Sequence, residues 1–163
     1  MKVESVPIAT LSQDPANARK HDDKNLEAIK ASLRRFGQQK PIVVDSSNVV
    51  RAGNGTLAAA IALGWESINV VQTDLQGSEA TAYAIADNRT AELADWDVEM
   101  LAASLNGLDE ELTLAAGFAD EELKKLLASI EVPDFSPEGE ESQQRLDEKK
   151  PIVCPACGVQ FEA

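Results

Sequence analysis

The chain has 163 residues, of which 44% are apolar and 4% aromatic, which is enough apolar material for the core of one compact domain followed by a tail. Residues 1–65 carry a net charge of +3 and residues 66–163 a net −16, and so acidic a surface repels DNA phosphates, which argues against tight unaided DNA binding. No apolar run approaches the ~20 residues of a membrane span, and the first residues lack the apolar core of a signal peptide, so we expect a cytoplasmic protein with no membrane partner.

The first part of the chain predicts a strand, a polar loop and a helix, in that order. Residues 2–8 predict the strand. His21 or Asp22 is expected to cap the helix, and Gly37 is suited to the position just after its last turn. The apolar residues of this helix recur at spacings of three, four and three and therefore share one face; they are Leu26, Ile29, Leu33 and Phe36.

Strand and helix patterns continue to alternate up to residue 71. Residues 41–45 predict a buried strand, and residues 49–51 predict a strand that returns after a turn. Residues 52–55 break this strand and open directly into a helix, which Gly64 ends. Residues 65–71 then end in another strand.

The rest of the chain predicts helices and a tail. A helix over residues 78–93 is expected to be broken or bent near Asp87-Asn88, and further helices are expected to begin after Asp95 or Asp97 and at Asp120. The fold class is therefore α+β, with a mixed sheet and helices, a helical subdomain and a flexible tail. We expect the divisions to be a sheet domain, a helical subdomain, an acidic linker and a tail, over residues 1–94, 95–130, 131–150 and 151–163.

The most informative stretch is the turn at residues 53–56, where a strand runs into a helix through Gly53, Asn54, Gly55 and Thr56. Glycine permits positive φ and lets a ligand approach the backbone closely. The unpaired N–H groups of the first helical turn and the helix dipole favour an anion at the same place, and Thr56 adds a hydroxyl group. The turn therefore suits phosphate, although a tight turn alone would explain the glycines equally well.

From about residue 3 to residue 128, the chain resembles the ParB/sulfiredoxin superfamily, in particular the short ParB N-terminal-like proteins of phages and mobile elements. The resemblance rests on the order and spacing of several short segments: Asn17-Ala18-Arg19, Ala31-Ser32-Leu33, Phe36-Gly37, residues 39–44, Gly53-Asn54-Gly55-Thr56, residues 86–93, Gly117-Phe118 and Glu121-Glu122-Leu123. It implies a ParB/sulfiredoxin-like fold and a nucleotide site.

In ParB relatives, a Gly-x-x-Arg turn and a Glu-Asn-x-x-Arg helix surround a triphosphate and its metal. Here Gly53 matches the turn glycine, but Thr56 stands in place of the arginine, which weakens the case for hydrolysis more than for binding. Asp87 stands in place of the glutamate, and Arg89 comes earlier than the family's arginine. The resemblance thus implies a nucleotide and phosphate site formed by Arg19, Gly53, Asn54, Gly55, Thr56, Asn88 and Arg89, with Mg²⁺ held by Asp87 and Asn88.

Each of these residues also has a simpler explanation. Asp87-Asn88-Arg89 would equally form a solvated bend in a helix, and Arg19 would equally be an exposed arginine of a loop.

Sulfiredoxin chemistry is disfavoured because residues 53–56 contain no cysteine. A kinase would need an acidic base, and Glu92 or Asp87 could serve as one. Nuclease activity is not supported, because the only histidine, His21, is not part of a recognisable pattern of metal ligands.

The tail contains the only two cysteines, Cys154 and Cys157, in a Cys-x-x-Cys-Gly turn typical of zinc-binding knuckles. Tetrahedral zinc takes four ligands and the chain offers two. Two chains would have to share one Zn²⁺, or a partner would have to supply the other ligands, or the knuckle is a remnant. A redox role is disfavoured because no thioredoxin-like βαβ pattern surrounds the pair.

Two functions follow, and the sequence leaves open whether the protein is an enzyme. The first is a ParB-like nucleotide-binding switch or adaptor that acts in DNA modification or partition of a phage or mobile element. Its partners would be a nucleotide and a protein, namely a DNA methyltransferase, another DNA-processing protein or a second copy of the chain. The second is an enzyme that uses the nucleotide, as a small-molecule kinase or an NTPase. A DNA-binding or nuclease-type ParB protein is a weaker alternative, because no helix-turn-helix with a basic recognition helix is evident.

Overall fold

The computed structural model describes residues 2–128, 151–155 and 157–162. The chain divides into two units, residues 1–130 and residues 131–163, which are described separately. The predicted linker, 131–150, lies outside the described residues. Among the residues that are described, no helix is both long and apolar enough to cross a membrane.

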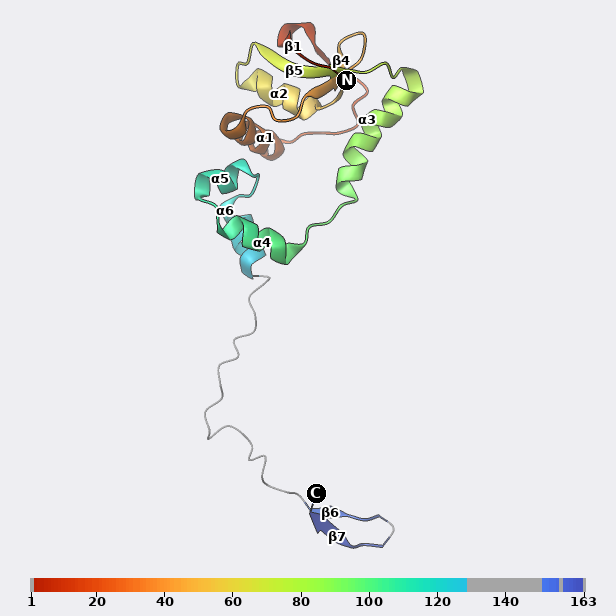
Figure 1. Ribbon diagram of the computed structural model, residues 1–163, viewed down its shortest axis with the longest axis vertical. Helices are drawn as coiled ribbons and strands as arrows, with labels where there is room; N and C mark the ends of the chain where they lie inside the picture. The colour runs from red at the N-terminus through yellow and green to blue at the C-terminus, as the bar shows by residue number, and fades with distance from the viewer. Residues whose placement is uncertain (1, 129–150, 156, 163) are drawn as a thin grey trace. The chain divides into compact units, whose positions relative to one another are not determined.

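The first unit is built on a five-stranded mixed sheet with the order β1-β5-β3-β4-β2, of which Figure 1 labels β1, β5 and β4. Two pairs are antiparallel: β1 (Val3–Pro7) with β5 (Ser67–Gln72), and β3 (Ile42–Val44) with β4 (Val49–Ala52). The other two are parallel, β3 with β5 and β2 (Ser12–Gln13) with β4. A short 3-10 turn, η1 (Ile8–Thr10), separates β1 from β2. The predicted α+β fold with a mixed sheet is therefore confirmed.

Two helices pack beside the sheet and close the core. The α2 helix (Asn54–Ala62) lies next to both β3 and α1 (Asp23–Phe36), as Figure 1 shows. Its alanines Ala59 and Ala60 are fully buried, and such small side chains let neighbouring backbones approach closely. Together with Val50 and Leu57 they form the centre of the apolar core.

Both predicted ends of α1 are present. The carboxylate of Asp22 accepts a hydrogen bond from the N–H of Asn25, 2.8 Å away, which makes Asp22 the N-cap. Gly37 ends the helix with φ 68°, and its N–H donates to Leu33 O. The helix spans all four residues of the predicted apolar face, of which Leu33 is buried and Phe36, in the final turn, is 42% exposed.

The second half of this unit is helical. The α3 helix (Gly77–Glu92) runs without a break, so of the break or bend expected near Asp87-Asn88, the break is wrong. The side chain of Asn88 instead donates to Ala84 O one turn earlier, at 2.9 Å. Three shorter helices follow: α4 (Val98–Asn106), α5 (Glu110–Ala115) and α6 (Asp120–Ala128).

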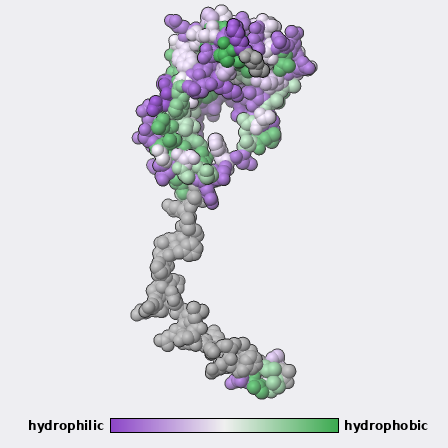
Figure 2. Space-filling view, viewed as in Figure 1, coloured by the Kyte–Doolittle hydropathy of each residue, from purple (hydrophilic) through white to green (hydrophobic). Residues whose placement is uncertain are grey.

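Of these three, the short α5 was not predicted, and it packs against α1. The α4 helix packs against α6, and its N-cap is Asp97, one of the two predicted candidates. Figure 2 shows an opening through this unit, on the side where α3 leads into α4 in Figure 1. The second unit contains an antiparallel hairpin of β6 (Pro151–Val153) and β7 (Gln160–Glu162).

Candidate functional site

The predicted turn lies where β4 passes into α2. Gly53 is the N-cap of the helix and has φ 94°, a left-handed conformation that L-residues with a side chain rarely adopt. The helix begins at Asn54, so Thr56 lies in its first turn, as predicted. The first helical hydrogen bond of α2 is the one that the backbone N–H of Leu57 donates to Gly53 O, at 2.9 Å. The backbone N–H groups before it are the ones that a helix start presents to an anion.

The two glycines of the turn make room for protein side chains. A Cβ on Gly53 would lie 2.5 Å from Ile42 Cγ2, and a Cβ on Gly55 would lie 2.6 Å from His21 Cε1. Both distances are far below a van der Waals contact. Each glycine therefore makes room for a neighbouring side chain at the turn, and close approach of a ligand to its backbone stays a prediction.

The turn opens onto a cavity of about 230 Å³. Most of the predicted residues line it together, although they come from the loop before α1, the α2 turn and α3: Arg19, Gly53, Asn54, Gly55, Thr56, Asp87 and Asn88. The cavity also has four polar lining residues that were not proposed as ligands: Asn17, His21, Lys40 and Arg51. In the sequence, His21 is a candidate helix cap and the only histidine, and Lys40 lies in one of the segments of the family resemblance, but neither residue is predicted to belong to the nucleotide site.

Arg89 is placed differently. It lines an adjoining cavity of about 220 Å³, which shares Asn17, Arg19 and Asn88 with the first. Its Nη1 lies 3.2 Å from Glu92 Oε2, and the other carboxylate oxygen of Glu92 is ion-paired with Arg19. One carboxylate thus binds both arginines that were expected to bind phosphate.

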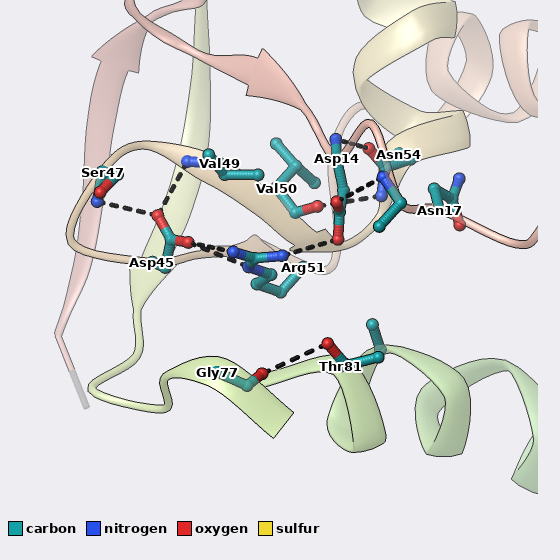
Figure 3. A network of polar contacts seen from close by, with 12 residues as sticks. Asp14, Asn17, Asp45, Ser47, Val49, Val50, Arg51, Asn54, Gly77 and Thr81 are labelled. Carbon is teal, nitrogen blue, oxygen red and sulfur yellow. Dashed lines mark hydrogen bonds and ion pairs between the residues drawn. The ribbon is translucent and has the colours of Figure 1, made fainter. Parts of the chain in front are cut away.

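The side chain of Asn54 has a structural role (Figure 3). Its Oδ1 accepts a hydrogen bond from the N–H of Asp14 at 3.1 Å, and its Nδ2 donates to Val50 O at 3.0 Å. Asn54 is only 9% exposed. It therefore ties the start of α2 to β4 and to the loop after β2, which leaves its backbone N–H as the group available to an anion.

Arg51 also lines the cavity, but two carboxylates neutralise it (Figure 3). Its Nε and Nη2 donate to Asp45 Oδ2 at 2.9 and 2.7 Å, and its Nη1 donates to Asp14 Oδ2 at 2.8 Å. The hydrogen bonds with Asp45 raise the pKa of Arg51 against the opposing effect of burial. Burial alone would raise the pKa of Asp45, but hydrogen bonds from Val49 N–H, from Arg51 and from Ser47 N–H hold it below its ordinary value.

The residues expected to hold Mg²⁺ offer oxygen ligands at the cavity. Asp87 supplies a carboxylate. The Nδ2 of Asn88 donates a hydrogen bond to Ala84 O, so the Oδ1 of Asn88 is the atom suited to a metal. The pKa of Tyr83 is raised mainly by burial and to a lesser degree by the negative charge of Asp87. In the part of the chain that the structure describes, no three His, Cys, Asp or Glu side chains group around a possible metal. A cation at Asp87 would therefore need further oxygens from a ligand.

In the second unit, Cys154 and Cys157 lie in the turn of the β6–β7 hairpin. The N–H of Gly158 donates to Cys154 O at 2.9 Å, and Gly158 has φ 73°. Cys154 N–H donates in turn to Val159 O at 2.9 Å. The turn thus carries two sulfur donors on a closed loop, and zinc binding stays a prediction.

Comparisons with known proteins identify relatives of the first unit. The ParB N-terminal domain family matches residues 1–89. The ParB-like nuclease domain-containing protein YnaK of Escherichia coli (strain K12) is 30% identical over 71 residues, which are 44% of this chain and 82% of YnaK. The nucleoid occlusion protein of Bacillus thuringiensis (strain Al Hakam) is 27% identical over 92 residues, which are 53% of this chain; the match covers only 32% of that protein.

Among solved structures, the C-terminally truncated chromosome-partitioning protein ParB of Caulobacter crescentus, complexed with CTP-γ-S, has the same fold with a TM-score of 0.70. The match has 21% sequence identity and covers 82% of this chain and 81% of that one. Together with the match to the ParB N-terminal domain family, this shared fold confirms the predicted resemblance to ParB-like proteins.

Proposed function

The chain belongs to the ParB N-terminal domain family, and we propose that it is a nucleotide-binding switch or adaptor that holds the phosphates of CTP at the turn of residues 53–56. The observation that carries the proposal is that Arg19, Lys40 and the first turn of α2 meet at one cavity. Two cationic side chains and the start of a helix provide the charge and the N–H donors that a triphosphate requires.

The choice of CTP is supported by the Caulobacter protein, which shares the fold and was solved with CTP-γ-S. Mg²⁺ fits the same proposal, because Asp87 and Asn88 present two oxygen ligands and the phosphates would supply others. Asp87 also lies 3.9 Å from Lys40 in an exposed ion pair, so a bound cation would compete with Lys40 for that carboxylate.

We further propose that the acidic half of the chain binds a protein partner in DNA partition or modification. Residues 66–163 carry a net charge of −16, which suits a basic protein surface better than DNA. Large apolar side chains are exposed where α3 leads into α4, with Leu93 at 65%, Trp96 at 71% and Met100 at 66%. A DNA methyltransferase, another DNA-processing protein and a second copy of the chain are the candidate partners.

Titration calorimetry with CTP, ATP and GTP, each with and without Mg²⁺, tests the nucleotide proposal. We expect CTP to bind in the presence of Mg²⁺, and Asp87→Asn to weaken that binding and reduce its dependence on Mg²⁺. Asp95→Asn is the matched control, because it removes the same charge from an exposed residue outside the cavity. Absence of heat with all three nucleotides up to millimolar concentration would refute the proposal.

A phosphate-release assay separates the switch from the enzyme. Binding without release supports the switch or adaptor, whereas release at a steady rate that Asp87→Asn abolishes would assign the chain to the nucleotide-using enzymes. A gel-shift assay at physiological salt tests the DNA-binding alternative, and the net charge of −13 predicts no shift for the protein alone.

A further inference from the structure

The imidazole of His21 lies against the backbone of Gly55, in the first turn of α2. A Cβ on Gly55 would be 2.6 Å from Cε1 of the ring and 2.9 Å from each ring nitrogen. Any residue other than glycine would therefore displace the ring. Gly55 has no positive φ that would otherwise demand glycine, so the contact with His21 is the reason for this residue that the structure provides.

The hydrogen bond of His21 determines which ring nitrogen faces a ligand. Its Nδ1 lies 2.7 Å from Asn25 Oδ1. An amide oxygen can only accept, so Nδ1 carries the hydrogen and donates it. Asn25 is itself held in the first turn of α1, where its N–H donates to Asp22 Oδ1. Nε2 is therefore the nitrogen that gains a proton, and among the described residues no hydrogen bond to Nε2 is found.

The charged groups around the ring favour an anion beside it. His21 lines the nucleotide cavity with Arg19, Lys40, Arg51 and Asp87, and it also lines a second recess with Asp14. Arg51 is bound to Asp14 and Asp45, and Arg19 is bound to Glu92. A proton on His21 would thus add a cation that no carboxylate yet pairs with, next to the N–H groups at the start of α2.

We propose that His21 is a phosphate ligand of this site, and that nucleotide binding strengthens as the imidazole becomes protonated. The inference rests on the proposed nucleotide function and adds its pH dependence. Phosphate oxygens favour the charged ring, which donates from Nε2, whereas the neutral ring presents a lone pair to the anion.

The single histidine makes the test direct, because the chain gives one Cε1–Hε1 imidazole resonance in an NMR spectrum. The midpoint of its pH titration is measured without ligand, with Mg²⁺ and CTP, and with inorganic tripolyphosphate. We expect both ligands to raise the midpoint by about one pH unit, which corresponds to about tenfold tighter binding to the protonated form.

Calorimetry from pH 5.5 to 8.5 measures how the affinity for the nucleotide depends on the protonation of His21. The phosphates titrate in this range too, so the relevant quantity is the ratio of the affinities of wild type and His21→Gln at each pH. We expect a ratio of about ten at pH 5.5 that falls towards one at pH 8.5. Lys20→Gln is the control, since it removes a positive charge from the neighbouring residue, and its ratio is expected not to change with pH.

Gly55→Ala gives a second variant that moves the ring without removing it. The added Cβ meets the end of a side chain that can rotate away, so the fold is expected to persist while the affinity at pH 5.5 falls towards that of His21→Gln. If the ligands bind but leave the midpoint and the affinity ratio unchanged, the role of His21 is refuted and the nucleotide function stands. If the wild type binds neither CTP nor tripolyphosphate at any pH, both proposals are refuted.

Discussion

Arg51 in β4 bonds to Asp14, 37 residues earlier in the chain, with its Nη1 2.8 Å from Asp14 Oδ2. The same guanidinium binds Asp45 through Nε and Nη2 (Figure 3). The side chains of Asp14 and Asp45 are 6% and 11% exposed, and that of Arg51 is 20% exposed. One arginine therefore ties the loop after β2 and the β3–β4 turn to the strand that leads into the phosphate-binding turn.

Arg51→Met should destabilise the first unit by about 3 kcal/mol, because it leaves two buried carboxylates without their cation. Urea unfolding followed by circular dichroism measures the change. Arg35→Gln is the control: it breaks the exposed ion pair with Glu111, at 3.5 Å, and should cost less than about 1 kcal/mol. Equal losses for the two variants would mean that the network around Arg51 does not stabilise the fold.

The same network should make stability sensitive to acid. The pKa of Asp45 is lower in the folded chain than its ordinary value, because its hydrogen bonds outweigh the effect of burial. Its contribution to stability is therefore complete above the unfolded value of about 3.9 and is lost as the pH falls through the folded value. As the pH is lowered below about 4, the urea midpoint of the wild type should fall more steeply than that of Asp45→Asn. Parallel curves would contradict this assignment.

Gly53→Ala should cost about 3 kcal/mol, more than Gly64→Ala at about 1 kcal/mol, although both glycines have positive φ. A Cβ on Gly53 would lie 2.5 Å from Ile42 Cγ2, whereas a Cβ on Gly64 has no neighbour within 4 Å. The comparison isolates the steric contact from the backbone strain that both variants share. The free energies of unfolding of the two variants check this, and equal values would show that Ile42 moves aside freely.

Glu92→Gln should tighten nucleotide binding several-fold, because the carboxylate now binds both Arg19 and Arg89. Arg19→Ala should weaken binding about thirtyfold, or about 2 kcal/mol, by removing a contact with phosphate. Arg89→Ala should cost less, since Arg89 lines the adjoining cavity. Calorimetry with Mg²⁺ and CTP compares the three variants, and a weaker Glu92→Gln would mean that the carboxylate positions the arginines for the ligand.

Zinc content tests the hairpin of the second unit. The chain offers two thiolates, Cys154 and Cys157, to a metal that takes four ligands, so the purified protein should bind at most about half an equivalent per chain. Cys154→Ser should abolish that zinc and leave the unfolding of the first unit unchanged. Elemental analysis measures both proteins, and one full equivalent per chain would require ligands beyond these two cysteines.

Several features follow from the sequence alone, because they depend on residues close together in the chain. The caps of α1 at Asp22 and Gly37, the turn at Gly53 and the position of Thr56 all rest on hydrogen bonds or φ angles within a few residues. The order of the strands and helices, read together with the family resemblance, was sufficient for the α+β class.

Tertiary structure alone decided how distant residues meet. The β2 strand has two residues and α5 has six, which is too short for a periodic pattern, and both exist because they pack on β4 and α1. The ring of His21 lies beside Gly55 where a Cβ would otherwise be, and Arg89 lines the adjoining cavity and pairs with Glu92. Such contacts depend on packing between elements, and local propensities carry no information about which side chains the fold brings together.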